Sequence, residues 1–151
     1  MRLEEAIKST RFSSEEHKVA LNILYSAWWL KTALSKELKS FGLTHEQYNV
    51  LRILNGKHPE ALCVRDIASR MIEKNSNVPR ILDRLLKKKL IKRNTSKEDR
   101  RETVIQLTPT GLSLLQNSSN QITSAIDHQI RLTKQEAKTI NQLLDKMKES
   151  I

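Results

Sequence analysis

The chain has 151 residues, the size of one domain with a buried core, and its single cysteine, Cys63, excludes an internal disulfide and a cysteine-based zinc site. No apolar run approaches the roughly 18 residues that span a bilayer, and the acidic start of the chain lacks the hydrophobic segment of a secretory signal, so we expect a cytoplasmic protein with no membrane partner. Lys and Arg total 27 against 17 acidic residues, a net charge of +10. This excess favours a nucleic-acid partner but also fits a merely basic surface.

The first long helix is predicted from Glu15 to about Phe41. Ser13 and Glu16 can form a capping box at its start, and Gly42 is placed to end it. At about 40 Å, by the rise per residue of an α-helix, it is longer than a small domain needs. Its apolar stripe comprises Leu24, Ala27, Leu34, Leu38 and Phe41.

The middle of the chain predicts further helices and a hairpin. A capping box of Thr44 and Gln47 opens one helix, and a short helix over 64–71 follows. Residues 90–94 and 103–107 are short, rich in β-branched or alternating residues, and separated by a charged loop. They are therefore predicted to pair as a two-stranded hairpin.

Two more helices follow the hairpin. Thr108 and Pro109 supply an N-cap and a first-turn proline for one, and Thr133 with Glu136 forms a capping box for the last. Their apolar residues recur at the intervals of helix-packing seams. These residues are Leu112, Leu115, Ile122, Ile126 and Ile130 in the first helix, and Ala137, Ile140, Leu144, Met147 and Ile151 in the second.

The order of these elements predicts a small unit mounted on helices at both ends. Residues 43–108 contain the short helices and the hairpin, whereas 1–42 and 109–151 contain long helices with apolar seams. We expect these three regions to form one compact chain, because no internal repeat, low-complexity segment or obvious linker separates them.

The helix that precedes the hairpin, ending near residue 89, separates an apolar face from a basic one. Asn75 or Ser76 can cap it, and Pro79 is tolerated near its first turn, where backbone donors lack helical partners. Its amides and guanidiniums are the groups that pair with base edges and phosphates, but an ordinary amphipathic helix with a solvated face has the same pattern. The apolar face comprises Val78, Ile81, Leu82, Leu85 and Leu86, and the polar face comprises Asn77, Arg80, Arg84, Lys87 and Lys88.

The loop of the predicted hairpin, 96–102, is far more charged than a turn requires. Its adjacent arginines, Arg100 and Arg101, suit the negative potential of a narrow minor groove. Asp99 is a candidate to hold one guanidinium through a charge-assisted hydrogen bond. A soluble loop whose charges cancel is the alternative interpretation.

Together these blocks resemble the MarR (multiple antibiotic resistance regulator) family of bacterial winged-helix transcription factors. The resemblance rests on the stretches VPRILDRL (78–85), KLIKR (89–93), DRR (99–101) and LTPTG (107–111) and on the spacing between them. It implies a mainly α fold with a small β-hairpin wing, a winged helix-turn-helix at 43–108, and dimerisation helices on both sides. It also implies a homodimer that binds a pseudo-palindromic operator as a sequence-specific regulator, usually a ligand-responsive repressor.

The resemblance assigns roles to individual residues. The helix before the hairpin would enter the major groove of double-stranded DNA, and the wing would reach the minor groove with Asp99 as a positioning residue. Pro79 departs from the family, in which a hydroxyl residue is common at that step. The candidate contacts are Ser76, Asn77, Val78, Pro79, Arg80, Arg84, Lys87 and Lys88 from the helix, and Lys97, Asp99, Arg100 and Arg101 from the wing.

Members of this family commonly respond to small phenolic or aromatic compounds, metals or oxidants. The expected pocket lies between the dimerisation helices and the winged unit, although core packing explains its aromatic residues at least as well. No metal or cofactor is expected, because the histidines lack the i, i+4 spacing of a ligand pair; a convergence of His45, Glu46 and His128 is the arrangement left open. Cys63 is interpreted as structural. The pocket candidates are Tyr25, Trp28, Trp29 and Tyr48, with Arg52 as a partner for an anion.

Two other classes of function compete with a DNA-binding regulator. An enzyme is not expected, because the sequence has no Gly-rich phosphate loop, nucleophile elbow or paired carboxylates. A winged helix that binds protein or RNA would share the fold. The basic helix and the basic wing together favour duplex DNA over that alternative.

Overall fold

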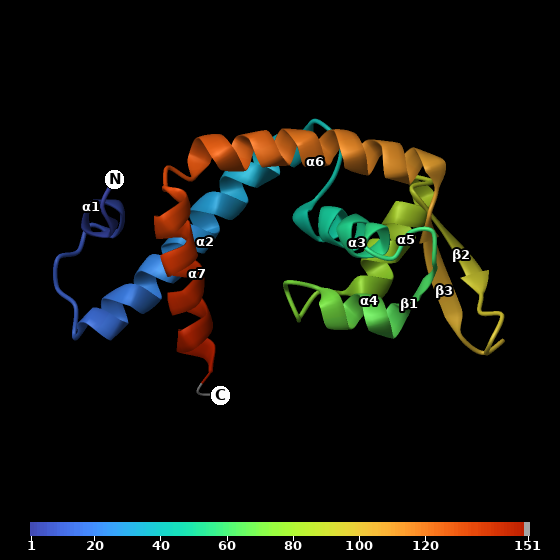
Figure 1. Ribbon diagram of the computed structural model, residues 1–151, viewed down its shortest axis with the longest axis horizontal. Coiled ribbons are helices and arrows are strands. Elements are labelled where there is room, and N and C mark those ends of the chain that lie inside the picture. The colour runs from blue at the N-terminus through green and yellow to red at the C-terminus, as the bar shows by residue number, and fades with distance from the viewer. Residues whose placement is uncertain (150–151) are drawn as a thin grey trace.

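The computed structural model describes residues 1–149, so Ile151, the last position of the predicted C-terminal seam, lies outside the described residues. Two long helices carry a small winged unit at one end, and α1 and α7 lie at the other (Figure 1). The helices are α1 (Leu3–Ile7), α2 (Glu15–Lys39), α3 (His45–Asn55), α4 (Val64–Arg70), α5 (Val78–Lys87), α6 (Pro109–Gln129) and α7 (Lys134–Lys148). The strands are β1 (Leu62–Cys63), β2 (Ile91–Thr95) and β3 (Thr103–Leu107).

Side-chain caps begin α3, α6 and α7 at the predicted residues. The hydroxyl oxygen of Thr44 accepts the backbone N–H of Gln47 at 3.2 Å, and that of Thr108 accepts the N–H of Gly111 at 3.0 Å. The capping box of Thr133 with Glu136 is also present, and its hydrogen bonds lower the pKa of the Glu136 carboxyl. These caps satisfy N–H groups that have no partner within their helix.

Two predicted caps were wrong by one or two residues. Ser14, not Ser13, caps α2 by accepting the backbone N–H of His17 at 3.1 Å, whereas the Ser13 hydroxyl bonds the ring of the same histidine. Asn77, not Asn75 or Ser76, caps α5. Its side-chain oxygen accepts the backbone N–H of Arg80, three residues further along the chain, at 3.2 Å.

The strands form one antiparallel sheet in the order β1-β3-β2. β2 and β3 pair as the predicted hairpin, from Ile91 opposite Leu107 to Thr95 opposite Thr103. The edge strand β1 was not predicted: it has two residues, too few to show a period, and Leu62 pairs with Ile105 far along the chain. The structure is therefore a winged helix-turn-helix with a three-stranded sheet.

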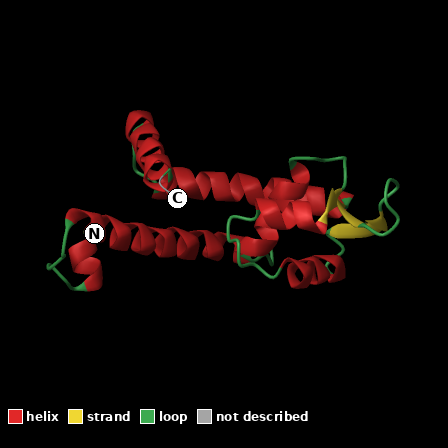
Figure 2. Ribbon diagram, turned by 90° about the horizontal axis from the view of Figure 1, so that it is seen from below, coloured by secondary structure: helices red, strands yellow, loops and turns green. Residues whose placement is uncertain are grey.

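One apolar core joins the winged unit to the two long helices. Leu51 of α3, Leu82 of α5 and Ile105 of β3 are completely buried within it. Leu38 of α2 and Leu115 of α6 belong to the same cluster. Since α2 and α6 lie side by side (Figures 1 and 2), these contacts fix the winged unit to the end of a helical pair.

Away from the winged unit, the helices expose apolar side chains. Leu24 and Trp28 of α2 are 68% and 59% exposed, and none of the described residues of α7 is buried. Leu143 of α7 is 59% exposed although its helix has a regular apolar seam. No helix within residues 1–149 combines the length and the apolar character that crossing a membrane requires.

Candidate nucleic-acid interface

Helix α5 lies at the surface of the winged unit with its two faces divided as predicted. Val78, Leu82 and Leu85 are buried in the core, while Arg80 and Arg84 are exposed. The predicted contact Val78 therefore packs its side chain inward, whereas Asn77, Pro79 and Lys87 are exposed beside the two arginines. The exposed face of α5 carries guanidinium, ammonium and amide groups, which pair with phosphates and base edges.

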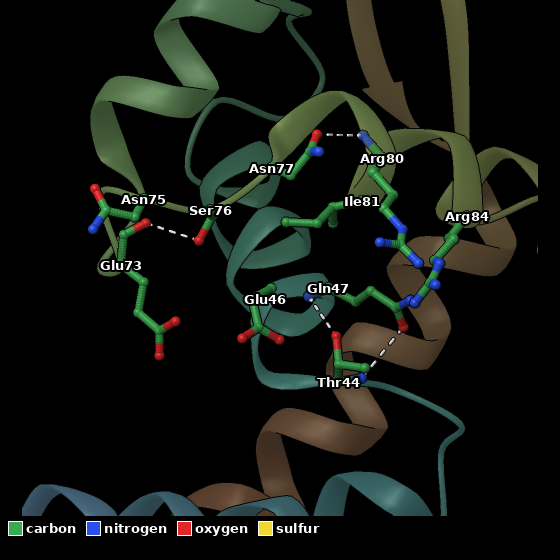
Figure 3. A pocket seen from close by; sticks show the side chains of 10 residues that line it. All are labelled: Thr44, Glu46, Gln47, Glu73, Asn75, Ser76, Asn77, Arg80, Ile81 and Arg84. Carbon is green, nitrogen blue, oxygen red and sulfur yellow. Dashed lines mark hydrogen bonds between the residues drawn. The ribbon is translucent and has the colours of Figure 1, made fainter.

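A polar hollow of about 400 Å³ separates α5 from the start of α3. Arg80 and Arg84 extend from α5 toward Thr44 and Gln47 at the opposite wall (Figure 3). Glu46 and the loop before α5 complete the lining. The two guanidiniums are thus presented from one face of the helix, a single turn apart, beside the backbone that begins α3. The remaining lining residues are Glu73, Asn75, Ser76, Asn77 and Ile81.

Side chains of α2 and α3 hold the loop before α5. The Asn49 side-chain oxygen accepts the backbone N–H of Ile72 at 2.9 Å. The ammonium of Lys31 forms a hydrogen-bonded ion pair with Glu73 and lies 3.6 Å from the Glu46 carboxylate. The bond to Glu73 raises the pKa of Lys31, while a backbone hydrogen bond at the start of α3, aided by Lys31, lowers the pKa of Glu46. Lys31 and Glu46 are therefore charged near neutral pH.

Lys88, predicted as a contact of the recognition helix, is engaged within the chain. Its ammonium donates to the backbone oxygen of Gly42 and, at 3.0 Å, to the side-chain oxygen of Gln47. Gln47 is 3% exposed, and the same oxygen accepts the N–H of Thr44 at 3.3 Å. Lys88 thereby ties the end of α5 to the start of α3, which the sequence did not indicate because the partners lie more than 40 residues apart.

The wing is shaped by hydrogen bonds around Asp99. Its carboxylate accepts the backbone N–H of Arg101 at 2.9 Å, so it holds the turn and not a guanidinium as expected. Ser96 adds to the turn by accepting two backbone N–H groups and by donating its own N–H to Glu102. The side chains of Lys97, Arg100 and Arg101 are left exposed at the tip.

An ion pair that sequence reasoning missed joins the wing to α5. A guanidinium nitrogen of Arg93 on β2 lies 3.2 Å from a carboxylate oxygen of Asp83 on α5. The two residues are close in sequence, but neither follows a helix or strand spacing that indicates contact. The basic helix and the basic wing are consequently attached to each other as well as to the core.

A second cavity, of about 550 Å³, lies between α2, α3, α6 and the loop before α5. Tyr48 and Arg52, two of the predicted pocket residues, line it, and the Tyr48 hydroxyl donates to the Ser119 hydroxyl at 3.1 Å. Tyr25, Trp28 and Trp29 are not among its lining residues: the rings of Tyr25 and Trp28 pack against each other on α2, tilted by 45° with centroids 5.5 Å apart. The apolar wall comprises Leu30, Leu34, Leu38, Met71, Ile122 and Ile126.

The two histidines considered for a metal site each bond a different backbone oxygen. A His45 ring nitrogen donates to the backbone oxygen of Lys31 at 2.7 Å, and a His128 ring nitrogen donates to that of Ser124 at 2.8 Å. No cluster of three or more metal-binding side chains occurs within residues 1–149. Cys63 is buried; the Asp66 backbone N–H favours its thiolate, but burial and the Glu102 and Asp66 side chains outweigh it and raise the pKa of the thiol.

Comparison with known proteins identifies relatives of the whole arrangement. Residues 43–103 match the model of the MarR family. The HTH-type transcriptional regulator PapX of Escherichia coli is 33% identical over 87 residues, 58% of this chain and 53% of PapX, so the match spans about half of that relative. The HTH-type transcriptional regulator MgrA of Staphylococcus aureus is 28% identical over 142 residues, covering 89% of this chain and 92% of MgrA.

Solved structures share the fold over most of the chain. Sco3205 of Streptomyces coelicolor, a MarR family transcriptional regulator solved in complex with DNA, superposes with a TM-score of 0.80 at 20% identity and covers 94% of this chain and 91% of its own. BpsR of Bordetella bronchiseptica, whose DNA binding is regulated by 6-hydroxynicotinic acid, has a TM-score of 0.72 at 24% identity and coverages of 87% and 99%. PapX, MgrA and Sco3205 are transcriptional regulators and not enzymes.

Proposed function

The chain belongs to the MarR family of transcriptional regulators, and from that premise we propose that it binds double-stranded DNA as a homodimer and represses transcription until a small molecule releases it. The observation that carries the proposal is the pairing of the exposed basic face of α5 with the basic wing. Asp83 and Arg93 fix these two surfaces to each other. A regulator that acts on DNA in this way belongs in the cytoplasm.

Helix α5 has the form of a helix that enters the major groove. The apolar face of α5 packs against the core, which leaves Asn77, Arg80 and Arg84 on the side away from the core. The first turn of such a helix reaches base edges. Arg100 and Arg101 at the wing tip suit the minor groove beside it. Sco3205, which shares the fold, was solved in complex with DNA.

The exposed apolar seams support a homodimer. α7 has 15 residues, close to the length of about 12–15 residues below which an isolated helix is marginal in water, and none of them is buried, so a partner surface would stabilise it. A second copy of the chain supplies one, because the same apolar faces of α2 and α7 meet across a two-fold axis. Two recognition helices then address half-sites about 34–36 Å apart on a pseudo-palindromic operator.

Leu143→Glu is expected to convert the dimer to a monomer. The substitution places a carboxylate at a side chain that is 59% exposed on one chain and, by the proposal, buried against the second. Sedimentation velocity over a range of protein concentrations measures the change. Gln142→Glu, an exposed position on the opposite face of the same helix, adds the same charge and is expected to stay dimeric. A dimeric Leu143→Glu variant would show that α7 is not part of the interface.

The second cavity supports regulation by a small aromatic or phenolic effector. Its walls are largely apolar, and Tyr48 and Arg52 supply a hydroxyl and a cation for an oriented ligand. Residues of the loop before α5 line the same cavity, so an occupant contacts the segment that leads into the recognition helix. BpsR, with the same fold, is regulated by a small aromatic acid.

The test of the function is binding of the purified protein to the DNA upstream of its own gene, titrated with salt. We expect one dimer per site and a log affinity that falls steeply against log salt concentration, because several Lys and Arg side chains displace counterions from phosphates. Adding aromatic acids and phenols to the bound complex then identifies effectors by release of the DNA. Equal affinity for random duplex, or no binding at low salt, would contradict a sequence-specific regulator.

A further inference from the structure

A cluster of three charged side chains joins α2 to the segment that leads into α5. Lys31 of α2 lies between the carboxylates of Glu73, with which it is hydrogen-bonded, and Glu46, at 3.6 Å. All three line the second cavity, and both carboxylates also line the hollow in front of α5. The cluster therefore stands between the cavity and the basic face of the recognition helix.

The backbone of Glu73 carries this contact into the first turn of α5. Its carbonyl oxygen accepts the Ser76 hydroxyl at 2.8 Å and the Ser76 N–H at 3.2 Å (Figure 3). The next residue, Asn77, caps α5 by accepting the N–H of Arg80 at 3.2 Å. A side chain that holds Glu73 thus restrains the turn that presents Asn77 and Arg80.

Because the segment before α5 is short and exposed, its position depends on the few side chains that hold it. Ile72 is 83% exposed, and its N–H is bound by Asn49 of α3. The Lys74 ammonium bonds the backbone oxygen of Ser69 in α4 at 2.7 Å. Lys31 supplies the contact from α2, which is outside the winged unit.

We propose that Lys31 is a positioning residue for DNA binding: by pairing with Glu73 it holds the turn before α5 in the geometry that meets the major groove. The proposal rests on the proposed function, because it concerns how α5 is held in position to bind DNA. The proposal predicts that the Glu73 carboxylate, although it lies beside the DNA-binding face, strengthens DNA binding. The direct electrostatic effect of a negative charge on binding to a polyanion has the opposite sign.

The Glu73→Gln variant separates the two effects by their sign. If Glu73 acts only through its charge, removing it tightens binding to a polyanion; if it positions the turn, binding weakens by about two- to fivefold, the range of an exposed ion pair. Lys31→Met is expected to weaken binding by a similar factor, and Lys31→Arg, which keeps the cation, to restore it. The double variant Lys31→Met/Glu73→Gln is expected to bind no more weakly than either single one, because both changes remove one interaction.

Two matched controls change the charge of the protein without removing the contact between Lys31 and Glu73. Lys36→Met removes a cation from an exposed position of the same helix, and Glu98→Gln removes a carboxylate from the exposed wing. Lys36→Met is expected to leave the affinity within about twofold, and Glu98→Gln to leave it unchanged or slightly tighter. Since Lys31 and Glu73 are about half exposed, all of these variants are expected to fold.

Hydrogen–deuterium exchange of the free protein supplies a readout that needs no DNA. Amides of residues 72–80 are expected to exchange faster in Lys31→Met and Glu73→Gln than in the wild type or in either control. If the wild type binds no duplex, the proposed function fails while the exchange rates still decide whether Lys31 holds the turn. The positioning role would be overturned if Lys31→Met and Glu73→Gln exchanged at wild-type rates and Glu73→Gln bound DNA as tightly as the wild type or more tightly.

Discussion

A Gly111→Ala variant is expected to lose about 3 kcal/mol or more of unfolding free energy, at the upper end of what overpacking costs. Its added Cβ would lie 1.9 Å from the backbone oxygen of Leu90 and 2.9 Å from the carbonyl carbon. That carbonyl cannot turn away freely, because it accepts the N–H of Thr108 at 3.1 Å. The start of α6 must therefore shift away from the start of β2. Urea unfolding at a fixed protein concentration measures the loss, and the melting temperature is expected to fall by about 2–4 °C per kcal/mol.

The other two glycines are the controls for this variant. A Cβ on Gly56 would lie 3.4 Å from the oxygen of Ile53, in ordinary contact, so Gly56→Ala is expected to change stability by less than about 1 kcal/mol. Gly42 meets no atom within 4 Å but has a φ of +66°, so Gly42→Ala is expected to cost about 1–2 kcal/mol through backbone strain alone. If Gly111→Ala unfolded at the same urea concentration as Gly56→Ala, the close approach of α6 to Leu90 would be wrong.

The same glycine shows which part of the fold could be predicted from the sequence. Thr108 and Pro109 mark the start of α6 because a cap and a first-turn proline act within four residues. The reason for a glycine at 111 is its approach to Leu90, which no local pattern reports. Caps, faces and the hairpin are local, and these were largely confirmed, whereas β1 depends on a partner strand more than 40 residues away.

In the candidate site too, the local features could be predicted from the sequence and the contacts between separate elements could not. Periodicity placed Arg80 and Arg84 on the exposed face of α5, because one turn of helix determines it. It could not show that Lys88 reaches back to Gln47 or that Lys31 meets Glu73, since these pairs join separate elements. Nor could it show which aromatic residues line the cavity, because an apolar helix face looks the same whether its own chain or a second copy covers it.

The double variant Arg80→Ala/Arg84→Ala is expected to weaken operator binding by about 100-fold or more. A guanidinium that contacts bases is worth about 1–3 kcal/mol, and this change removes two from the same face of α5. Both side chains are exposed, so the fold and the melting temperature are expected to stay close to those of the wild type. Fluorescence anisotropy with operator and random duplex, each over a range of salt concentrations, measures the loss.

The control Arg131→Ala/Lys134→Ala removes two cations from the junction of α6 and α7, at the end of the molecule away from α5 (Figure 1). It lowers the net charge equally, and screening over about 8–10 Å leaves it little effect on DNA at the winged unit. If Arg80 and Arg84 read bases, their variant loses more affinity for the operator than for random duplex; if they bind phosphates, both affinities fall together and the salt slope drops by about one per arginine. Equal binding by the two double variants would mean that α5 does not enter the groove, and the basic face would then serve a partner other than DNA.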